Sequence, residues 1–505
     1  MAESAYGGTA SRGSAFDGSA PRSGNAGPTG GKGRASEVHT RTRTARESAS
    51  ARESASSQES APKRQVAREF SARTYARALP VVPVRARGLT IEGADGRRYL
   101  DCVSGAGTLA LGHNHPVVLE AIRKVLDSGA PLQVMNLTTP VEDAFVTELL
   151  RTLPPGLAHH ARVRFCGPAG TDPVATAGRL VRAATGRTRV IAFTDAHHGA
   201  TAEACAEPGD TREAPLACLP YPQDRHCPFG VGGERGVELA AHWAESVLDD
   251  RRSGKELPAG VILDAVRSES GVLPVPDVWT RRMRRITAER SVPLIADETE
   301  TGVGRTGAFW AVEHSGVVPD VLVLSKAIGG SLPLAAVVHR DDLHTGEPGT
   351  GAFRGNQLAL AAGAATLAHV REHRLAEHAA ALGSRMLTRL RSLAEEFGCV
   401  GDVRGRGLMI GIELTAPDRT RDVPAAGVRP ATAAELAATV QRECLRRGLI
   451  VDVTGPSANV VRLLPPLIVT EEQTTAVLDR LADALEAVDR SRGDLALPRG
   501  ACAAP

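Results

Sequence analysis

The sequence predicts a protein of the α/β class, with a large and mostly parallel central sheet followed by a smaller α/β unit. Short, unbroken apolar runs are separated by segments long enough to form helices. Strands that are apolar on both faces are typical of a parallel sheet covered by helices. The runs are Val190–Phe193, Val261–Val266, Pro293–Ala296, Val321–Leu324 and Ala335–Val338. After about Leu367, helical patterns alternate with short strands at Leu408–Leu414 and Val460–Leu464, which indicates a second, smaller unit.

The N-terminal part of the folded chain reads as a hairpin followed by helices. In RGLTIEGADGRRYLDC the dipeptide Asp95-Gly96 is a turn signal between two strand patterns. The stretch Pro116–Gly129 places apolar residues on one helical face and ends in glycine, and Val141–Leu153 repeats that pattern. A further helix is predicted over 174–185.

Composition divides the chain into four parts. The first 66 residues are rich in Gly, Ser, Ala and Arg, contain a tandem ARESAS repeat and have almost no aliphatic content, so we expect them to be disordered. The expected division is a low-complexity tail at 1–66, an N-terminal segment with the large domain at 67–365, a small C-terminal domain at 366–490, and a second tail at 491–505.

Charge and cysteine usage exclude several classes of function. The formal net charge is +2, which argues against nucleic acid or a membrane surface as the main partner. No apolar run is long enough to span a membrane, and the N-terminus lacks the apolar stretch of a signal peptide. The eight cysteines are scattered without zinc-ligand spacing. We therefore expect a cytoplasmic protein with reduced thiols and no metal site.

Lysine is rare in this chain, and one lysine has an unusual setting. Only five of the 60 basic residues are lysines, and arginine cannot supply a neutral amine. Lys326 follows the apolar run VLVLS and precedes AIGGSLPL. A lysine at a strand end is most often simply exposed. An apolar flank, however, favours the neutral, nucleophilic amine that Schiff-base formation needs, and glycines let backbone approach a ligand closely.

Two further patterns indicate a ligand site. Asp297 closes the apolar run PLIAD ahead of Lys326, and ligands of α/β folds bind at the carboxyl ends of strands. Asp297 could instead only cap the next helix. The segment GPAGTDP, from Gly167 to Pro173, precedes the predicted helix 174–185. A helix N-terminus offers free N–H groups to a phosphate, although many glycine-rich turns before helices bind nothing.

Longer segments carry a resemblance to a known family. The stretch PLIADETETGVGRTGAFWAVEHSGVVPDVLVLSKAIGGSLPLAAVV resembles the cofactor signature of class III aminotransferases. More narrowly, GAGTLALGHNHP, FCGPAGTD, CPFGVGGE, FRGNQLALAAGAATL and GDVRGRGLMIGIEL resemble the diaminobutyrate–2-oxoglutarate aminotransferases. The likeness runs from about Arg68 to Leu485. It implies a fold-type-I transferase that uses pyridoxal 5'-phosphate.

The resemblance also implies roles for individual residues. Lys326 would form the Schiff base with the cofactor and move the proton during the reaction, and Asp297 would hold the pyridine nitrogen protonated. Glu269 and Arg404 would form a gate in which Arg404 binds the α-carboxylate of glutamate and Glu269 neutralises Arg404 when an ω-amine is bound. The other residues implied to bind the cofactor are Gly170, Thr171, His197, Thr299 and Glu300, with His198-Gly199 in the family's aromatic-His-Gly loop.

Five positions depart from the family pattern: His197, Asp264, Arg267, Glu300 and Ala352. Glu300 stands where the family has a glutamine that bonds the cofactor's phenolic oxygen, and Ala352 replaces a threonine that reaches the phosphate from the neighbouring subunit. Asp264 and Glu300 would both lie close to the cofactor's phenolic oxygen, which is itself anionic. Like charges this close together raise the pKa of one carboxylate, so we expect Glu300 to be protonated. Arg267 could supply the charge instead only if the chain turns after Val266, because positions 264 and 267 of a strand point to opposite faces.

The expected reaction moves an amino group between glutamate/2-oxoglutarate and the terminal position of L-2,4-diaminobutyrate/L-aspartate 4-semialdehyde, in a homodimer. The partners would then be small amino acids and 2-oxo acids. Two alternatives stay open. One is a class III enzyme that acts on a different amine in a specialised biosynthetic pathway, and the other is a catalytically degenerate paralogue that serves as a partner subunit.

Overall fold

The computed structural model describes residues 79–134, 137–168, 171–194, 217–223, 227–249, 257–344, 355–416 and 431–496. Side chains are not described at 171, 217–218 and 491–496. The expected disordered tail at 1–66 therefore lies outside the described residues. The proposed boundaries of the four parts stay a prediction.

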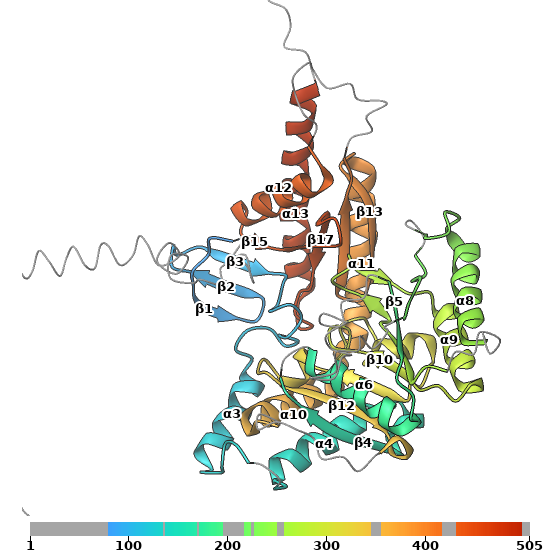
Figure 1. Ribbon diagram of the computed structural model, residues 1–505. Helices are drawn as coiled ribbons and strands as arrows, with labels where there is room; N and C mark the ends of the chain where they lie inside the picture. Colours follow the sequence, from blue (N-terminus) through green and yellow to red (C-terminus); the bar gives the residue numbers. More distant parts are fainter. Residues whose placement is uncertain are drawn as a thin grey trace, which may run out of the picture. The chain divides into compact units, whose positions relative to one another are not determined.

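A seven-stranded sheet forms the centre of the large α/β region (Figure 1). Its strand order is β4-β12-β11-β10-β7-β5-β6, and only β12 runs antiparallel to its neighbours. The strands are β4 (Ala161–Cys166), β5 (Val190–Phe193), β6 (Ala217–Leu219), β7 (Gly260–Leu263), β10 (Leu294–Asp297), β11 (Val321–Leu324) and β12 (Ala335–Arg340). The prediction of a mostly parallel sheet built from buried apolar runs is confirmed.

Helices cover both faces of this sheet because its strands are apolar on both sides. On one face α6 (Thr171–Thr185) packs its apolar residues against alternate residues of β7, β10, β11 and β12. On the other face lie α4 (Pro140–Thr152), α10 (Gln357–Glu372), α8 (Gly233–Asp249) and α9 (Asp277–Glu289). Helix α3 (Pro116–Asp127) packs on α10, and α5 (Pro155–Ala158) is a single turn.

Two smaller sheets flank the central one in sequence. The first has the order β1-β2-β3-β15 and the second β13-β14-β17-β16, while β8 and β9 form a short hairpin. Their strands are β1 (Pro83–Arg87), β2 (Thr90–Gly93), β3 (Arg98–Asp101), β8 (Val266–Arg267), β9 (Leu273–Pro274), β13 (Val400–Arg406), β14 (Met409–Leu414), β15 (Leu449–Ile450), β16 (Asp452–Thr454) and β17 (Val460–Leu463). Helices α11 (Leu375–Glu396) and α12 (Ala433–Arg446) pack on the second sheet, and α13 (Glu471–Ala496) packs on both of these helices. The hairpin predicted around Asp95-Gly96 is β2–β3.

Candidate active site

The site lies at the carboxyl ends of two neighbouring parallel strands. Strands β10 and β11 pair in register, with Asp297 opposite Val323. Asp297 is the last residue of β10 and is 8% exposed, and Lys326 follows directly after Ser325 at the end of β11. The backbone N–H of Thr299 donates to Asp297 Oδ1 at 3.0 Å. The structure therefore brings the two expected residues to one edge of the sheet, where α/β folds bind ligands.

Lys326 has a strained backbone and an accessible amine. It starts a 3-10 turn, Lys326–Gly329, with a φ of 52°, a conformation that side-chain-bearing residues rarely adopt and that clusters at functional sites. Its Nζ donates to the carbonyl oxygen of Ala106 at 3.3 Å and forms an ion pair with Glu300. The glycine at 330 serves packing, since a Cβ there would lie 2.3 Å from the carbonyl oxygen of Ala362 on α10.

Glu300 links Lys326 to a second cation. One carboxylate oxygen pairs with Lys326, and the other lies 3.6 Å from Nη1 of Arg462 on β17. Burial raises the pKa of Glu300, but the charges of Lys326 and Arg462 outweigh burial and hold this pKa below its ordinary value. Lys326 and Arg462 therefore favour the ionised carboxylate in this structure. The expectation of a protonated Glu300 concerned a pocket that also holds the cofactor's anionic oxygen, and it stays a prediction.

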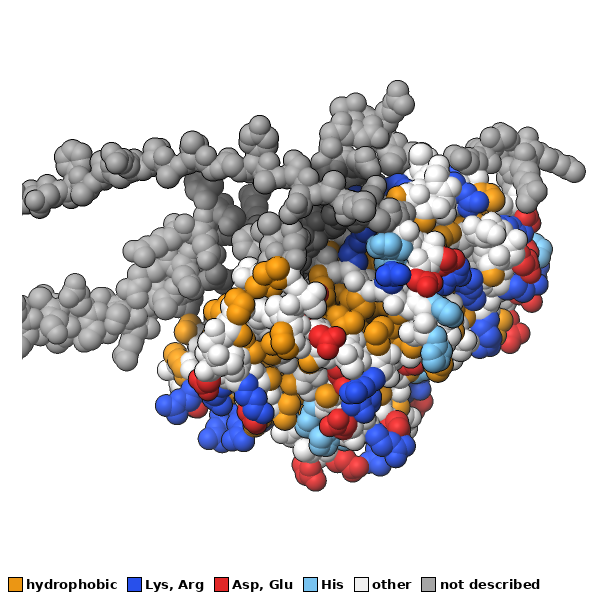
Figure 2. All heavy atoms as spheres, turned by 90° about the horizontal axis from the view of Figure 1, so that it is seen from below, with side chains coloured by type: hydrophobic (Ala, Val, Ile, Leu, Met, Phe, Trp, Pro, Cys, Tyr) orange, Lys and Arg blue, Asp and Glu red, His pale blue; other side chains and the backbone are white. Residues whose placement is uncertain are grey.

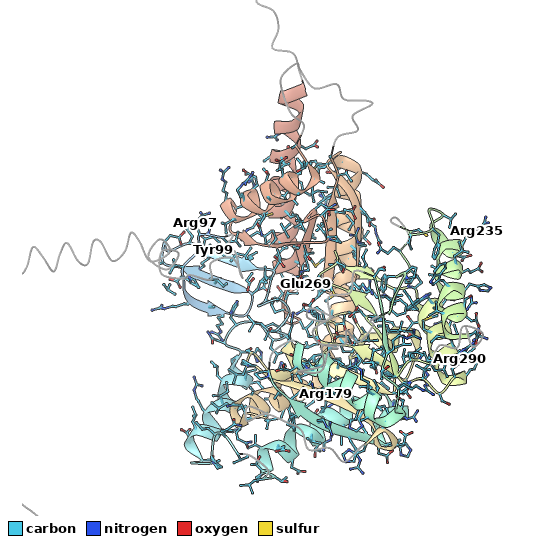
Figure 3. All side chains as sticks on the ribbon, viewed as in Figure 1. Arg97, Tyr99, Arg179, Arg235, Glu269 and Arg290 are labelled. Atoms are coloured by element: carbon cyan, nitrogen blue, oxygen red, sulfur yellow. The ribbon has the colours of Figure 1, made fainter. Side chains whose placement is uncertain are left out.

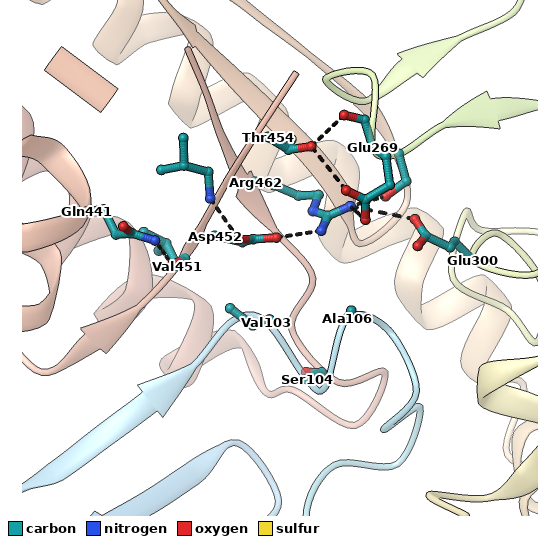
Figure 4. Close-up of polar contacts among 12 residues, drawn as sticks. Val103, Ser104, Ala106, Glu269, Glu300, Gln441, Val451, Asp452, Thr454 and Arg462 are labelled. Carbon is teal, nitrogen blue, oxygen red and sulfur yellow. Dashed lines mark hydrogen bonds and ion pairs between the residues drawn. The ribbon is translucent and has the colours of Figure 1, made fainter. Parts of the chain in front are cut away.

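Arg462 is the centre of the polar cluster shown in Figure 4. Its side chain is 2% exposed. Nη1 donates to Glu269 Oε1 at 2.8 Å and to Ser268 Oγ at 2.7 Å, and Nη2 donates to Asp452 Oδ2. Burial lowers the pKa of Arg462, but the surrounding carboxylates raise it by more, so the net shift is upward. The guanidinium is therefore a fixed positive charge next to Lys326 and Glu300.

The expected partner of Glu269 was Arg404, and the structure corrects that pairing. Arg404 Nη1 instead donates to Asp402 at 2.7 Å and to Glu413 at 2.6 Å, and Nε donates to the carbonyl oxygen of Gly271 at 2.9 Å. Glu269 lies inward in Figure 3, where strands of different sheets approach, whereas Arg235 on α8 projects outward. In this structure the carboxylate of Glu269 therefore pairs with Arg462 and not with Arg404.

Asp264 and Arg267 lie close together and form an ion pair. Strand β7 ends at Leu263 and β8 begins at Val266, so the chain turns between the two residues and brings them to one side. Arg267 Nε lies 3.5 Å from Asp264 Oδ2, and its guanidinium stacks 3.6 Å from the ring centre of Tyr221. The strand geometry expected for positions 264 and 267 is wrong, because the strand is interrupted there.

Several expected cofactor contacts lie outside the described residues. These are Gly170, His197 with His198-Gly199, and Ala352, together with the side chain of Thr171. Thr171 itself begins α6, three residues before the predicted helix start at 174, and phosphate binding at this helix stays a prediction. Thr299 is described, and its hydroxyl oxygen is buried with no hydrogen-bond partner.

Arg462 is the site residue that sequence reasoning missed. It interrupts an apolar run in VVRLLPP, and the run was interpreted only as a strand. A charged side chain is rarely fully buried unless it has a partner, so a single arginine in an apolar, buried strand predicts a paired and special position. That signal could have identified Arg462 as a functional residue.

The described residues contain neither a metal-binding cluster nor a membrane-spanning helix. Within these ranges no His, Cys, Asp or Glu group has the arrangement needed to hold a metal ion. No helix in the described part of the chain has the length and apolarity required to cross a membrane.

Comparisons with known proteins show which family the chain resembles. The family model for class III aminotransferases matches residues 70–485. The diaminobutyrate–2-oxoglutarate aminotransferase of Rhizobium meliloti is 45% identical over 85% of this chain and 92% of its own length. The protein of the same name from Haemophilus influenzae is 39% identical over 84% of this chain and 95% of its own.

Solved structures share the fold as well. An amine transaminase from an uncultivated Pseudomonas species, determined in its PLP-bound form, is 27% identical with a TM-score of 0.70, and the match covers 86% of this chain and 97% of that one. An (S)-enantioselective omega-transaminase from Thermomicrobium roseum is 26% identical with a TM-score of 0.70, covering 81% of this chain and 93% of that one.

Proposed function

This chain belongs to the class III aminotransferases, which are pyridoxal-phosphate enzymes, and we propose that it transfers the terminal amino group of L-2,4-diaminobutyrate to 2-oxoglutarate and catalyses the reverse reaction. The observation that carries the proposal is the ion pair of Glu269 with Arg462 beside Lys326 and Glu300. The names of the two relatives described above support the choice of substrates.

The residues present fit pyridoxal phosphate. The edge of the sheet offers an accessible amine on Lys326, a buried carboxylate on Asp297 and an orphaned buried hydroxyl on Thr299. In this proposal Lys326 would bind the cofactor, Asp297 would hold its pyridine nitrogen protonated, and Thr299 and Glu300 would be further cofactor-binding residues. The N-terminus of α6, with Gly170 and Thr171, would hold the phosphate, and His197 would be a further cofactor-binding residue.

The bound cofactor withdraws electrons from the substrate carbon that carries the transferred amine, so that a proton can leave that carbon. Lys326 performs the proton transfer with its Nζ as general base and acid. The Ala106 carbonyl and the Glu300 carboxylate both contact Nζ and hold the lysine at the carboxyl end of β11. Asp297 places a buried carboxyl group at the neighbouring strand end.

Arg462 and Glu269 let one pocket accept substrates of different charge. Glutamate and 2-oxoglutarate carry a second carboxylate that diaminobutyrate and aspartate semialdehyde lack. When that carboxylate is present it binds Arg462 and displaces Glu269, and when it is absent Glu269 covers Arg462. The side chain of Glu269 is 37% exposed, so it has room to turn away from Arg462, which stays buried.

We further propose a cytoplasmic homodimer. The described cysteines are free, and four of them are buried, which suits a reducing compartment. Figure 2 shows hydrophobic side chains gathered among charged ones on one face. Leu126 near the end of α3 is exposed, as are Leu132 and Leu137 after it. The Leu132 carbonyl oxygen accepts from the N–H of Gln357 at the start of α10. Exposed apolar residues of this kind suit a subunit contact.

The test is a product assay on purified protein supplied with pyridoxal phosphate. L-2,4-diaminobutyrate and 2-oxoglutarate should give glutamate, and Lys326→Ala should give none. Borohydride reduction and peptide mapping should place the cofactor on Lys326 and not on Lys124, which is exposed and paired with Glu120 at 2.8 Å. Glutamate formation from another ω-amine but not from diaminobutyrate would establish a different substrate. A label on Lys124 would overturn the site.

A further inference from the structure

Asp452 and Arg462 form a directly opposed cross-strand pair. They face each other in the antiparallel register of β16 and β17, and Arg462 Nη2 donates to Asp452 Oδ2 (Figure 4). Directly opposed residues on neighbouring strands are held at a fixed separation by the ladder of backbone hydrogen bonds. The position of this carboxylate relative to Arg462 is therefore set by the sheet itself.

The two main carboxylate partners of Arg462 are held with unequal firmness. The second oxygen of Asp452, Oδ1, accepts from the backbone N–H of Val453 at 2.9 Å. The second oxygen of Glu269, Oε2, lies 3.5 Å from the hydroxyl of Thr454, at the limit of a hydrogen bond. Asp452 is thus fixed at both oxygens, whereas Glu269 is fixed at only one and is the partner that can move.

The partners also lie on different edges of the guanidinium. Glu269, Glu300 and Ser268 all approach Nη1, and Asp452 approaches Nη2. Without Asp452, both remaining carboxylates would draw the guanidinium toward the Nη1 side. That edge would then be less available to a substrate carboxylate.

We propose that Asp452 is a positioning residue that fixes the guanidinium of Arg462, so that its Nη1 edge opens to the second carboxylate of a dicarboxylate substrate when Glu269 moves away. The inference rests on the proposed role of Arg462. It adds to that role the residue that holds Arg462 in the orientation for binding. A carboxamide at position 452 keeps an acceptor for Nη2, whereas alanine removes it.

The experiment measures binding of glutarate, a five-carbon dicarboxylate with no amino or oxo group, to the cofactor-loaded full chain by titration calorimetry. Asp452→Ala should raise the Kd of glutarate about 10-fold, the effect of one lost charge-assisted hydrogen bond. Asp452→Asn should restore most of the affinity. In kinetics, Asp452→Ala should raise the KM for 2-oxoglutarate far more than it lowers kcat or raises the KM for diaminobutyrate. Asp479→Ala, the same change on an exposed position of α13, controls for charge alone.

The outcomes separate the inference from the proposed function. Glutarate binding that survives Arg462→Met would show that Arg462 does not bind the carboxylate, and the proposed function would lose its gate. If Arg462→Met abolishes binding but Asp452→Ala binds glutarate as tightly as the unmodified protein or more tightly, Asp452 only balances charge and the positioning role is overturned. If Asp452→Ala and Asp452→Asn weaken glutarate binding equally, the positioning role is overturned as well, because the acceptor that asparagine keeps for Nη2 would then make no difference.

Discussion

Glu300 holds the amine of Lys326 in an ion pair at the carboxyl end of β11, and its second oxygen faces Arg462 at 3.6 Å. The same lysine is proposed to bind the cofactor. Cofactor binding must therefore break a contact that the cofactor-free chain already makes. Glutamine at position 300 would keep the shape of the side chain but would not form that ion pair.

Glu300→Gln should speed the uptake of pyridoxal phosphate by cofactor-free protein about 10-fold, because no ion pair has to be broken to reach Lys326. The pKa of Glu300 is lowered, so the carboxylate is ionised at every pH above its ordinary range. The gain should accordingly stay constant from about pH 6 to pH 8. Stopped-flow absorbance after addition of the cofactor measures the rate, with Glu289→Gln, on the exposed end of α9, as the control. A gain that appears only at high pH would mean that Glu300 is protonated at neutral pH after all.

Arg404 and Arg462 are both paired with carboxylates, but only Arg462 is proposed to bind substrate. Arg404→Met would leave Glu413, whose side chain is 6% exposed, without its ion-pair partner Arg404. We expect a loss of about 3 kcal/mol in the free energy of unfolding. The change should not affect dicarboxylate binding selectively. Urea unfolding and the KM for 2-oxoglutarate, measured alongside Arg462→Met, check both points. A selective loss of affinity for 2-oxoglutarate in Arg404→Met would return the gate to Arg404.

The sequence predicted the sheet far better than the polar cluster. Buried parallel strands are apolar along their whole length, so β10 and β11 could be recognised together with the residues that end them, Asp297 and Lys326. The partners of Glu269 could not be recognised in the same way. Arg462 lies 193 positions from Glu269, and only the pairing of strands from different parts of the chain brings the two side chains together.

A row of histidines joins α3 to α10. The ring centres of His115 and His369 are 4.8 Å apart, and those of His369 and His373 are 3.9 Å apart. Burial, and next to it the charge of His373, lowers the pKa of His115. Burial and the other two histidines likewise lower the pKa of His369, against a small opposing effect of Glu372.

These lowered pKa values predict acid sensitivity. The unfolded chain takes up protons near pH 6.5, whereas folded His115 and His369 take them up only at lower pH. The free energy of unfolding should therefore fall as the pH drops below about 6.5, and this loss of stability should level off below the pKa values of the folded histidines.

His115 is also the N-cap of α3 and makes no capping hydrogen bond with its side chain. His115→Asn should both weaken the pH dependence and raise the free energy of unfolding by about 1 kcal/mol. Urea unfolding from pH 5 to pH 8, with the exposed His159→Asn as control, measures both effects. An unchanged pH dependence would show that His115 does not titrate with unfolding.

Glu269→Gln tests the movable half of the gate. The carboxylate of Glu269 competes with a substrate carboxylate for Arg462 Nη1, and a neutral amide competes less strongly because hydrogen bonds between charged partners are the stronger ones. The KM for 2-oxoglutarate should fall about 5-fold or more, the effect of about 1 kcal/mol. The KM for diaminobutyrate should rise, because the buried charge of Arg462 is then less well covered while that substrate is bound. The ratio between these KM values is the decisive quantity, since a general loss of structure would move both upward. If both KM values fall, or if neither changes, Glu269 does not cover Arg462 during the reaction, and another residue must allow one pocket to accept both substrates.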